Sequence, residues 1–136
     1  MSNPDVHTGG CLCGAVRYRV TGPLREVALC HCGQCRKFHG HVGAYTNVAR
    51  DKLELTADGG LAWYMSSTIA KRGFCRMCGS SLFWERLGAD TISIAAGTLD
   101  GPTGLKTTRQ IFAAPEHRGD YYELDTHLET FPGTMG

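Results

Sequence analysis

The sequence predicts a single, mainly-β domain, and three observations support this prediction. Short segments of alternating apolar and polar residues recur along the chain, which is the pattern of half-buried strands. Turn signals separate these segments, and the 136 residues include 18 glycines. No linker, repeat or low-complexity segment divides the sequence. The whole chain, residues 1–136, is therefore expected to form one domain.

The first half of the chain contains three predicted strands and one helical turn. Cys11 is expected to open the ordered part, and residues 15–20 alternate valine and tyrosine with arginine, which indicates a strand. After a Gly-Pro turn, a short strand over residues 26–29 leads to Cys30. Residues 34–39 predict one helical turn that Gly40 ends. An extended pattern resumes over residues 42–48.

The second half contains six further predicted strands. Two of them are separated by a loop rich in glycine and aspartate, two flank the last pair of cysteines, and two follow with apolar residues at alternate positions. They cover residues 51–55, 61–66, 69–74, 81–85, 91–96 and 107–113. The tail, residues 115–136, is richer in charge. Its expected anchors are Tyr121, Tyr122, Leu124, Leu128 and Phe131.

Composition and charge exclude several classes of partner. The formal net charge is +1 and basic and acidic residues are interspersed, so nothing indicates a nucleic acid or an anionic membrane as a partner. The first ten residues are polar and lack the apolar core of a secretory signal, and no apolar stretch reaches the length of a membrane span. A reducing cytoplasm is the expected location. The sequence does not indicate an oligomeric state.

The seven cysteines provide the strongest functional signal. They form three groups with the spacing C-x-C, C-x-C-x2-C and C-x2-C, which close loops too small for unstrained disulfides. In a reducing compartment such groups are typical of metal ligands, and zinc is the metal that four thiolates or three thiolates commonly bind. The groups are Cys11 and Cys13; Cys30, Cys32 and Cys35; and Cys75 and Cys78. Seven ligands predict two zinc ions, held by four and by three cysteines.

The four-cysteine site combines the first and last groups. Cys11 and Cys13 with Cys75 and Cys78 complete a closed, structural zinc site that would connect the start of the domain to its middle. Glycine follows one cysteine of each group, at positions 14, 33 and 79. Because glycine adopts positive φ readily, we expect these residues to turn backbone N–H groups toward sulfur.

The three-cysteine site is predicted to be catalytic. Cys30, Cys32 and Cys35 leave the fourth position of a zinc ion open, and three thiolates make the ion a weak Lewis acid toward water. Such a site suits an incoming thiol, which would bind as a thiolate and add to a small electrophile. Arg36 and Lys37 follow Cys35 directly and could offset the charge or bind a substrate carboxylate.

Histidines and basic residues near the cysteines have more than one possible role. One of the histidines His31, His39 and His41 could supply a fourth ligand, which would make the second site structural, with His31 the weaker candidate. Basic residues near the last pair of cysteines are expected to be solvated rather than to bind substrate. They are Lys71, Arg72 and Arg76. The sequence contains no phosphate loop, dinucleotide fingerprint, nucleophile elbow or H-E-x-x-H motif.

Four segments of the chain resemble the family of glutathione-dependent formaldehyde-activating enzymes, which includes the centromere protein V domain. They are residues 10–18 (GCLCGAVRY), 30–37 (CHCGQCRK), 72–84 (RGFCRMCGSSLFW) and 96–100 (AGTLD). The resemblance covers about residues 8–125, in order and at family-like spacing.

The resemblance implies a zinc-stapled domain of twisted antiparallel β-sheets and the same division of the cysteines. Cys11, Cys13, Cys75 and Cys78 match the structural ligands of the family, and Cys30, Cys32 and Cys35 match its catalytic ligands. The implied reaction is the addition of the glutathione thiol to formaldehyde, which gives S-hydroxymethylglutathione. The enzyme is classed as a carbon–sulfur lyase because the reverse of this reaction breaks a carbon–sulfur bond. The alternatives are a non-catalytic binding module or glutathione carrier, and a redox-labile zinc site.

Overall fold

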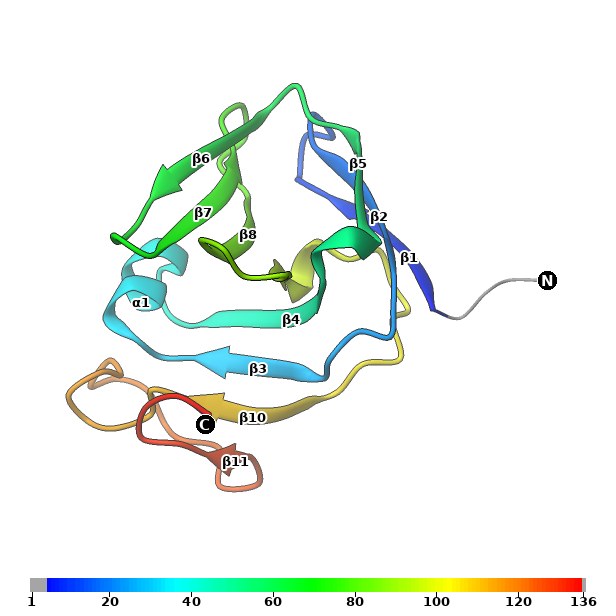
Figure 1. Cartoon of the computed structure of the whole chain (residues 1–136). Coiled ribbons are helices and arrows are strands. Elements are labelled where there is room, and N and C mark those ends of the chain that lie inside the picture. The colour runs from blue at the N-terminus through cyan, green and yellow to red at the C-terminus, as the bar shows by residue number, and fades with distance from the viewer. Residues whose placement is uncertain (1–4, 136) are drawn as a thin grey trace.

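The computed structural model describes residues 5–135 and contains two β-sheets with one α-helix (Figure 1). The alternating segments of the sequence form most of the strands, because one face of each packs on the core. The strands are β1 (Val6–Gly10), β2 (Arg17–Thr21), β3 (Val27–Cys30), β4 (Gly43–Ala49), β5 (Leu53–Ala57), β6 (Leu61–Met65), β7 (Ala70–Cys75), β8 (Ser81–Arg86), β9 (Thr91–Ala95), β10 (Thr107–Ile111) and β11 (Glu129–Thr130). The helices are α1 (Gly33–His39) and two 3-10 turns, η1 (Arg50–Lys52) and η2 (Ala96–Thr98).

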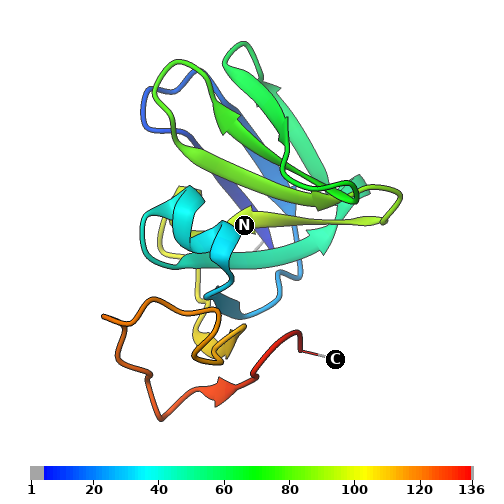
Figure 2. The same cartoon turned by 90° about the vertical axis from the view of Figure 1, so that its left-hand side faces the viewer.

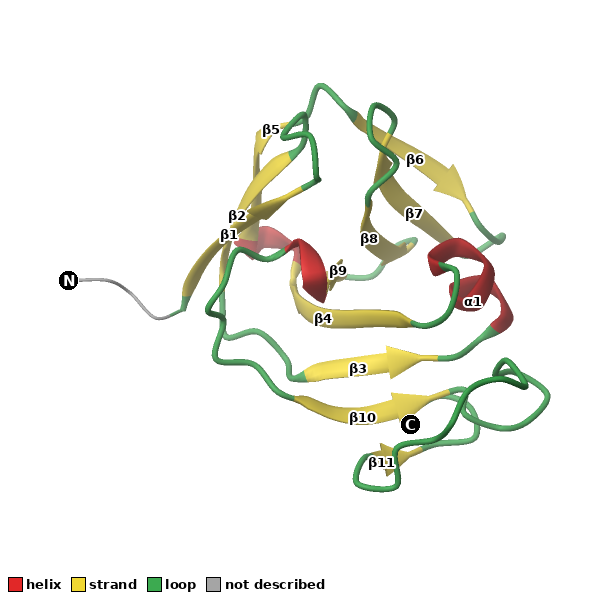
Figure 3. Ribbon diagram, turned by 180° about the vertical axis from the view of Figure 1, so that it is seen from behind, coloured by secondary structure: helices red, strands yellow, loops and turns green. Residues whose placement is uncertain are grey.

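The larger sheet has the strand order β11-β10-β3-β4-β9-β8-β7-β6, and the smaller one has the order β1-β2-β5. The larger sheet curls, so that β6 and β7 lie above β3 and β10, with α1 between them at one side (Figures 1 and 3). This arrangement confirms the predicted mainly-β fold of twisted sheets. Neighbouring strands are antiparallel except at β10, which runs parallel to both β3 and β11.

The core lies where the small sheet meets the middle of the large one. Its fully buried side chains include Val16, Tyr18 and Val20 from the first predicted strand, together with Phe83 and Ile94. The rings of Tyr18 and Phe83 meet edge to face at 5.6 Å. Burial of each such apolar side chain stabilises the fold by about 1.5–3 kcal/mol. The core therefore joins the two sheets into one body.

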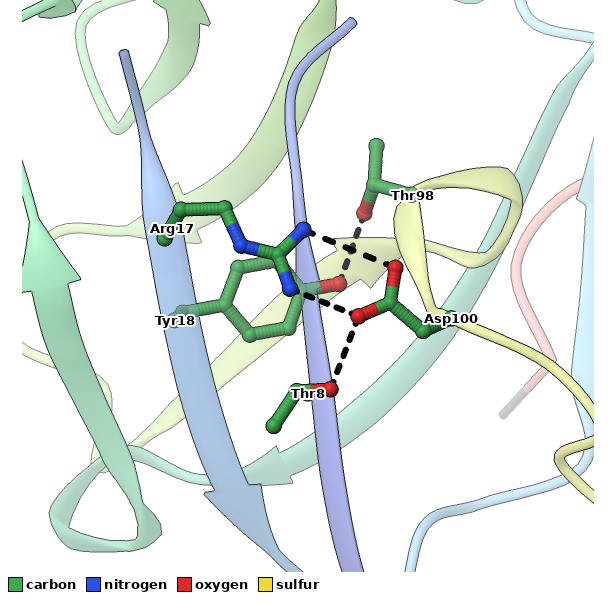
Figure 4. Close-up of polar contacts among 5 residues, drawn as sticks. All are labelled: Thr8, Arg17, Tyr18, Thr98 and Asp100. Carbon is green, nitrogen blue, oxygen red and sulfur yellow. Dashed lines mark hydrogen bonds and ion pairs between the residues drawn. The ribbon is translucent and has the colours of Figure 1, made fainter. Parts of the chain in front are cut away.

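A polar cluster fastens the small sheet to the segment after η2 (Figure 4). The Arg17 guanidinium donates to Asp100 Oδ2 at 2.6 Å, and the Thr8 hydroxyl donates to the same oxygen at 2.7 Å. These bonds lower the pKa of Asp100. Beneath them, the hydroxyls of Tyr18 and Thr98 hydrogen-bond at 2.7 Å.

Strand β1 corrects the expectation that the ordered part begins at Cys11. Apart from Val6, its residues are polar or small and give no alternating signal, but the strand pairs along its whole length with β2. Gly9 has no room for a side chain, because a Cβ there would come within 2.5 Å of the Thr98 carbonyl oxygen. β1 is therefore stabilised by its pairing with β2 and cannot be recognised from an apolar pattern. The predicted strand over residues 51–55 is likewise divided between η1 and β5.

The C-terminal segment crosses beneath the helix. After β10, the chain forms turns that run alongside α1 and β3 before it returns as β11 (Figure 2). Backbone bonds fasten the return, among them Phe131 N–H to the Gln110 carbonyl at 3.0 Å. Among residues 5–135, no helix is long and apolar enough to cross a membrane.

Candidate metal centres

The four-cysteine cluster forms where the turn after β1 meets the turn between β7 and β8. The Sγ atoms of Cys11, Cys13, Cys75 and Cys78 all lie within 4.8 Å of one another. The distances are 3.7 Å from Cys11 to Cys13 and 3.8 Å from Cys13 to Cys75. Tetrahedral zinc, with Zn–S bonds of about 2.3 Å, separates its sulfur ligands by about 3.8 Å. The arrangement thus fits a zinc ion.

Local backbone geometry supports these sulfur atoms. Gly14 and Gly79 adopt positive φ, 87° and 80°, which closes the tight turns that carry the cysteines. The Val16 N–H donates to Cys11 Sγ at 3.2 Å. Hydrogen bonds from Ser80 lower the pKa of Cys78 to about 5. The expectation of positive φ is confirmed at these two glycines. It is wrong for Gly33, which does not adopt positive φ and is the first residue of α1.

The three-cysteine cluster forms where β3 meets α1. Cys30 ends β3, Cys32 is the N-cap residue of α1 and Cys35 lies in the first turn of the helix. Their Sγ atoms lie within 4.8 Å of one another, and the Cys35 N–H donates to Cys32 Sγ at 3.3 Å. Hydrogen bonds from the thiols of Cys30 and Cys35 lower the pKa of Cys32. Gly40, at φ 85°, ends the helix as expected.

None of the three histidines joins this cluster in the part of the chain that the structure describes. The buried His31 ring packs on Tyr122 at 4.2 Å between ring centres. His39 Nε2 hydrogen-bonds the Tyr45 hydroxyl at 2.5 Å, and the His41 ring packs on Tyr121 and Tyr122. The geometry thus favours a three-ligand site over a closed one.

The three-cysteine cluster lines a cavity of about 760 Å³, which is within the usual range for small-molecule sites. The described lining contains no aspartate or glutamate, whereas three arginines contribute to it. Its residues are Arg25, Ala28, Cys30, Cys32, Gly33, Gln34, Cys35, Tyr45, Asn47, Ser67, Ile69, Ala70, Arg72, Trp84, Arg86, Ser93, Ile111, Phe112, His117, Thr134 and Met135. The cavity combines thiol groups with positive charge.

Arg72 corrects the expectation that the basic residues near the last cysteines are solvated. Its side chain is buried, and one guanidinium nitrogen lies 3.6 Å from Cys35 Sγ. Lys71 and Arg76 do lie at the surface, where Lys71 covers the Trp63 ring and Arg76 donates to a backbone carbonyl. Because neighbours on a strand point to opposite faces, Arg72 faces inward where Lys71 faces outward.

Tyr45 connects Arg72 to the helix. Its hydroxyl accepts a bond from Arg72 at 3.3 Å and lies against His39. Burial raises the pKa of Tyr45, and burial also lowers the pKa of His39 to about 4. At neutral pH both groups are uncharged.

The C-terminal segment completes the cavity wall. No pattern in the sequence indicated this contribution. Phe112 follows β10 directly and adopts φ 52°, a rare conformation for a residue with a side chain. Its ring meets the His117 ring edge to face at 5.2 Å. Both residues line the cavity, as does Met135. The parallel pairing of β10 with β3 brings them beside the cysteines.

The chain is similar in sequence or in structure to several known proteins. A Halomonas elongata protein, named as a candidate glutathione-dependent formaldehyde-activating enzyme, is 34% identical, and the match covers 87% of this chain and 80% of that protein. An uncharacterised lyase of Schizosaccharomyces pombe is 27% identical over 57% of this chain and 56% of its own length. A crystal structure of a Rhodobacter sphaeroides protein matches with a TM-score of 0.55 and 27% identity, over 71% of this chain and 91% of that one.

The family model described as glutathione-dependent formaldehyde-activating enzyme matches residues 6–115, which hold all seven cysteines. This match covers most of the chain and both cysteine clusters. The chain belongs to the family of glutathione-dependent formaldehyde-activating enzymes.

Proposed function

We propose that the protein is a zinc-dependent carbon–sulfur lyase. Its substrate would be the adduct of a small anionic thiol with a small electrophile, with S-hydroxymethylglutathione, formed from glutathione and formaldehyde, as the leading candidate. The observation that carries this proposal is the position of the three-cysteine cluster, which opens into a cavity with three arginines and no described acidic side chain. The reducing cytoplasm is the compartment in which we expect it to act.

The cysteines would hold two zinc ions. Cys11, Cys13, Cys75 and Cys78 have the spacing of a closed site, whereas Cys30, Cys32 and Cys35 offer three ligands only. An ion in such an open site supplies electrostatic stabilisation for a thiolate at neutral pH. The remaining tasks, which are binding, orientation and stabilisation of the reacting oxygen, belong to side chains of the cavity.

Arg25 and Arg86 are suited to bind the carboxylates of the thiol. Glutathione has two carboxylates, and a guanidinium binds a carboxylate through two parallel hydrogen bonds. Arg25 is half-buried and held by the carbonyls of Glu26 and Tyr45, whereas Arg86 is exposed at the end of β8. The absence of acidic side chains from the described lining favours an anionic ligand.

Tyr45 is suited to stabilise the reacting oxygen. When a thiolate adds to formaldehyde, sulfur supplies the electron pair of the new C–S bond, and the carbonyl pair moves to oxygen, which takes up a proton. The breakdown reaction reverses these changes. Tyr45 lines the cavity, and its hydroxyl is already held by Arg72 and His39. A bond from this hydroxyl would stabilise the developing negative charge on oxygen.

Two features support an enzyme rather than a binding module or a carrier. A fourth protein ligand, or a cavity too shallow for a tripeptide, would favour a non-catalytic role. In residues 5–135 the cluster has three ligands, and the cavity measures about 760 Å³. Both observations favour a site that exchanges a ligand.

The decisive experiment combines metal analysis, X-ray absorption and turnover on the full chain. We expect two zinc ions per chain, and a fourth sulfur ligand at the second ion only when glutathione is added. The same preparation should convert glutathione and formaldehyde to S-hydroxymethylglutathione and back. A metal environment that is already complete and unchanged by glutathione would contradict the proposal and support the binding module.

A further inference from the structure

Among residues 5–135, Arg72 is a buried cation without a carboxylate partner. Its side chain is 3% exposed, and the ion pairs among residues 5–135 involve other basic residues, namely Arg17, Arg50 and Lys71. Its Nε atom has no hydrogen-bond partner in the described part of the chain. A buried charge is costly unless an opposite charge or a strong hydrogen-bond network compensates it. We therefore expect a negatively charged group close to the guanidinium of Arg72.

Side chains of four residues lie close to the guanidinium of Arg72. One nitrogen lies 3.3 Å from the Tyr45 hydroxyl, and another lies 3.5 Å from Gln34 Oε1 and 3.6 Å from Cys35 Sγ. The Phe38 ring covers the group at 5.2 Å. A tyrosine hydroxyl, an amide and a phenyl ring carry no net charge at neutral pH. Of these neighbours, the cysteine cluster alone supplies an anion there.

We propose that Arg72 is the built-in counter-charge of the three-cysteine metal site. This inference rests on the proposed function, because it assumes a divalent ion at Cys30, Cys32 and Cys35. Three thiolates and one divalent cation carry a formal charge of −1, and a single guanidinium balances it. Arg72 is a positioning residue: it holds the thiolates in place and keeps the metal bound when no substrate is present.

The strand that carries Arg72 explains how the guanidinium is held in place. β7 also carries Cys75, a member of the four-cysteine cluster, at its end. Between them, Gly73 packs so closely against Phe83 and Trp63 that a Cβ would lie 3.1 Å from either ring. The strand that supplies a ligand to one cluster thus supplies the balancing charge to the other. The two sites share one rigid element.

The test is metal retention in the presence of a competing chelator, measured as zinc per chain on full-length protein loaded with two zinc ions. Replacement of a residue that supports a metal ligand typically lowers metal affinity about 10–100-fold. We expect Arg72→Met to lose the second zinc at about 10–100-fold lower chelator activity than the unmodified protein. Arg72→Lys, which keeps the charge, should restore most of the retention. Lys71→Met, which removes the neighbouring charge on the outer face, should retain both ions.

Three outcomes would overturn the inference. They are unchanged retention in Arg72→Met, equal losses in the Met and Lys variants, and an equal loss in Lys71→Met. If Arg72→Met does not fold, Arg72→Gln takes its place with the same expectations. Because the readout is zinc and not turnover, a protein that binds two ions without lyase activity would contradict the proposed function and still test Arg72.

Discussion

The two cysteine clusters contain the same ligand type but differ in number and surroundings. Cys11, Cys13, Cys75 and Cys78 lie in or beside tight turns at the margin of the core, and together they offer four ligands to a metal ion. Cys30, Cys32 and Cys35 lie at the junction of β3 and α1, beside a cavity and a buried arginine. The first arrangement suits a permanent connection between distant parts of the chain. The second suits exchange of a ligand.

Cysteine spacing alone does not distinguish the two clusters. Both clusters contain C-x-C and C-x2-C spacings. What separates them is the fourth position, and whether charged and hydrogen-bonding side chains surround it. Variants that act on one cluster and not on the other can therefore test the comparison directly.

The largest effect is expected from Cys78→Ser, which should destabilise the whole domain. Apparent binding free energies of structural zinc are about 10–16 kcal/mol in zinc-finger peptides, so loss of one ligand should lower the free energy of unfolding by several kcal/mol. Urea denaturation measures this change. Met77→Ser, at an exposed neighbouring position, is the control and should unfold like the unmodified protein. Unchanged stability in Cys78→Ser would contradict a structural role for the cluster.

Cys32→Ser should abolish turnover while the fold is kept. The variant should hold one zinc ion per chain in place of two, measured by elemental analysis, because the second site loses a ligand. The helix should persist, since serine can accept the N-cap bond that Cys32 Sγ accepts from the Cys35 N–H. Circular dichroism checks the fold. A fully active variant would refute the catalytic assignment of the three-cysteine cluster.

Tyr45→Phe should lower kcat/KM about 10²-fold, because one hydrogen bond to the reacting oxygen is lost. Both zinc ions should stay bound, since the tyrosine is not a ligand. Steady-state kinetics and metal analysis on the same sample check both expectations. Tyr121→Phe, at an exposed position in the tail, is the matched control. Turnover that falls equally in both variants would contradict the role of Tyr45.

Gly60→Ala should loosen the four-cysteine cluster without removing a ligand. A Cβ at Gly60 would lie 2.9 Å from Cys75 Sγ and 2.8 Å from the Ala15 side chain, so that sulfur must move. Such overpacking typically costs about 1–3 kcal/mol of stability. Gly59→Ala is the control, because a Cβ there meets nothing within 4 Å. Thermal denaturation should separate the two variants, and equal midpoints would count against tight packing at Cys75.

Asp100→Asn should have the smallest effect, and a pH-dependent one, because it touches neither cluster. The folded pKa of Asp100 is lowered, so its bonds stabilise the fold above the ordinary carboxyl pKa and are lost as pH falls through the lowered value. The stability difference between Asp100→Asn and the unmodified protein should be present at pH 7 and vanish in acid. The pair is exposed, so the difference should be small. A difference that grows in acid would contradict this sign.

The sequence predicted those features that depend on local spacing. The cysteine groups, the helix that ends at Gly40 and most strands follow from neighbouring residues, and the family was identified from the motifs. Features that depend on pairing between distant segments were missed or misjudged. Strand β1 lacks an apolar pattern, and the burial of Arg72 depends on which face of β7 meets α1. Arg72 does lie in one of the family-like segments, residues 72–84, which was a local signal that it belongs near the cysteines.

Two parts of the chain build the cavity wall. All seven cysteines, Arg72 and Tyr45 lie within residues 6–115, the part that the family model describes, whereas His117, Thr134 and Met135 reach the cavity from beyond it. Changes in the C-terminal segment can therefore reshape this cavity wall while all seven cysteines are kept. We expect relatives with the same cysteines to differ in the shape of this cavity where their C-terminal segments differ.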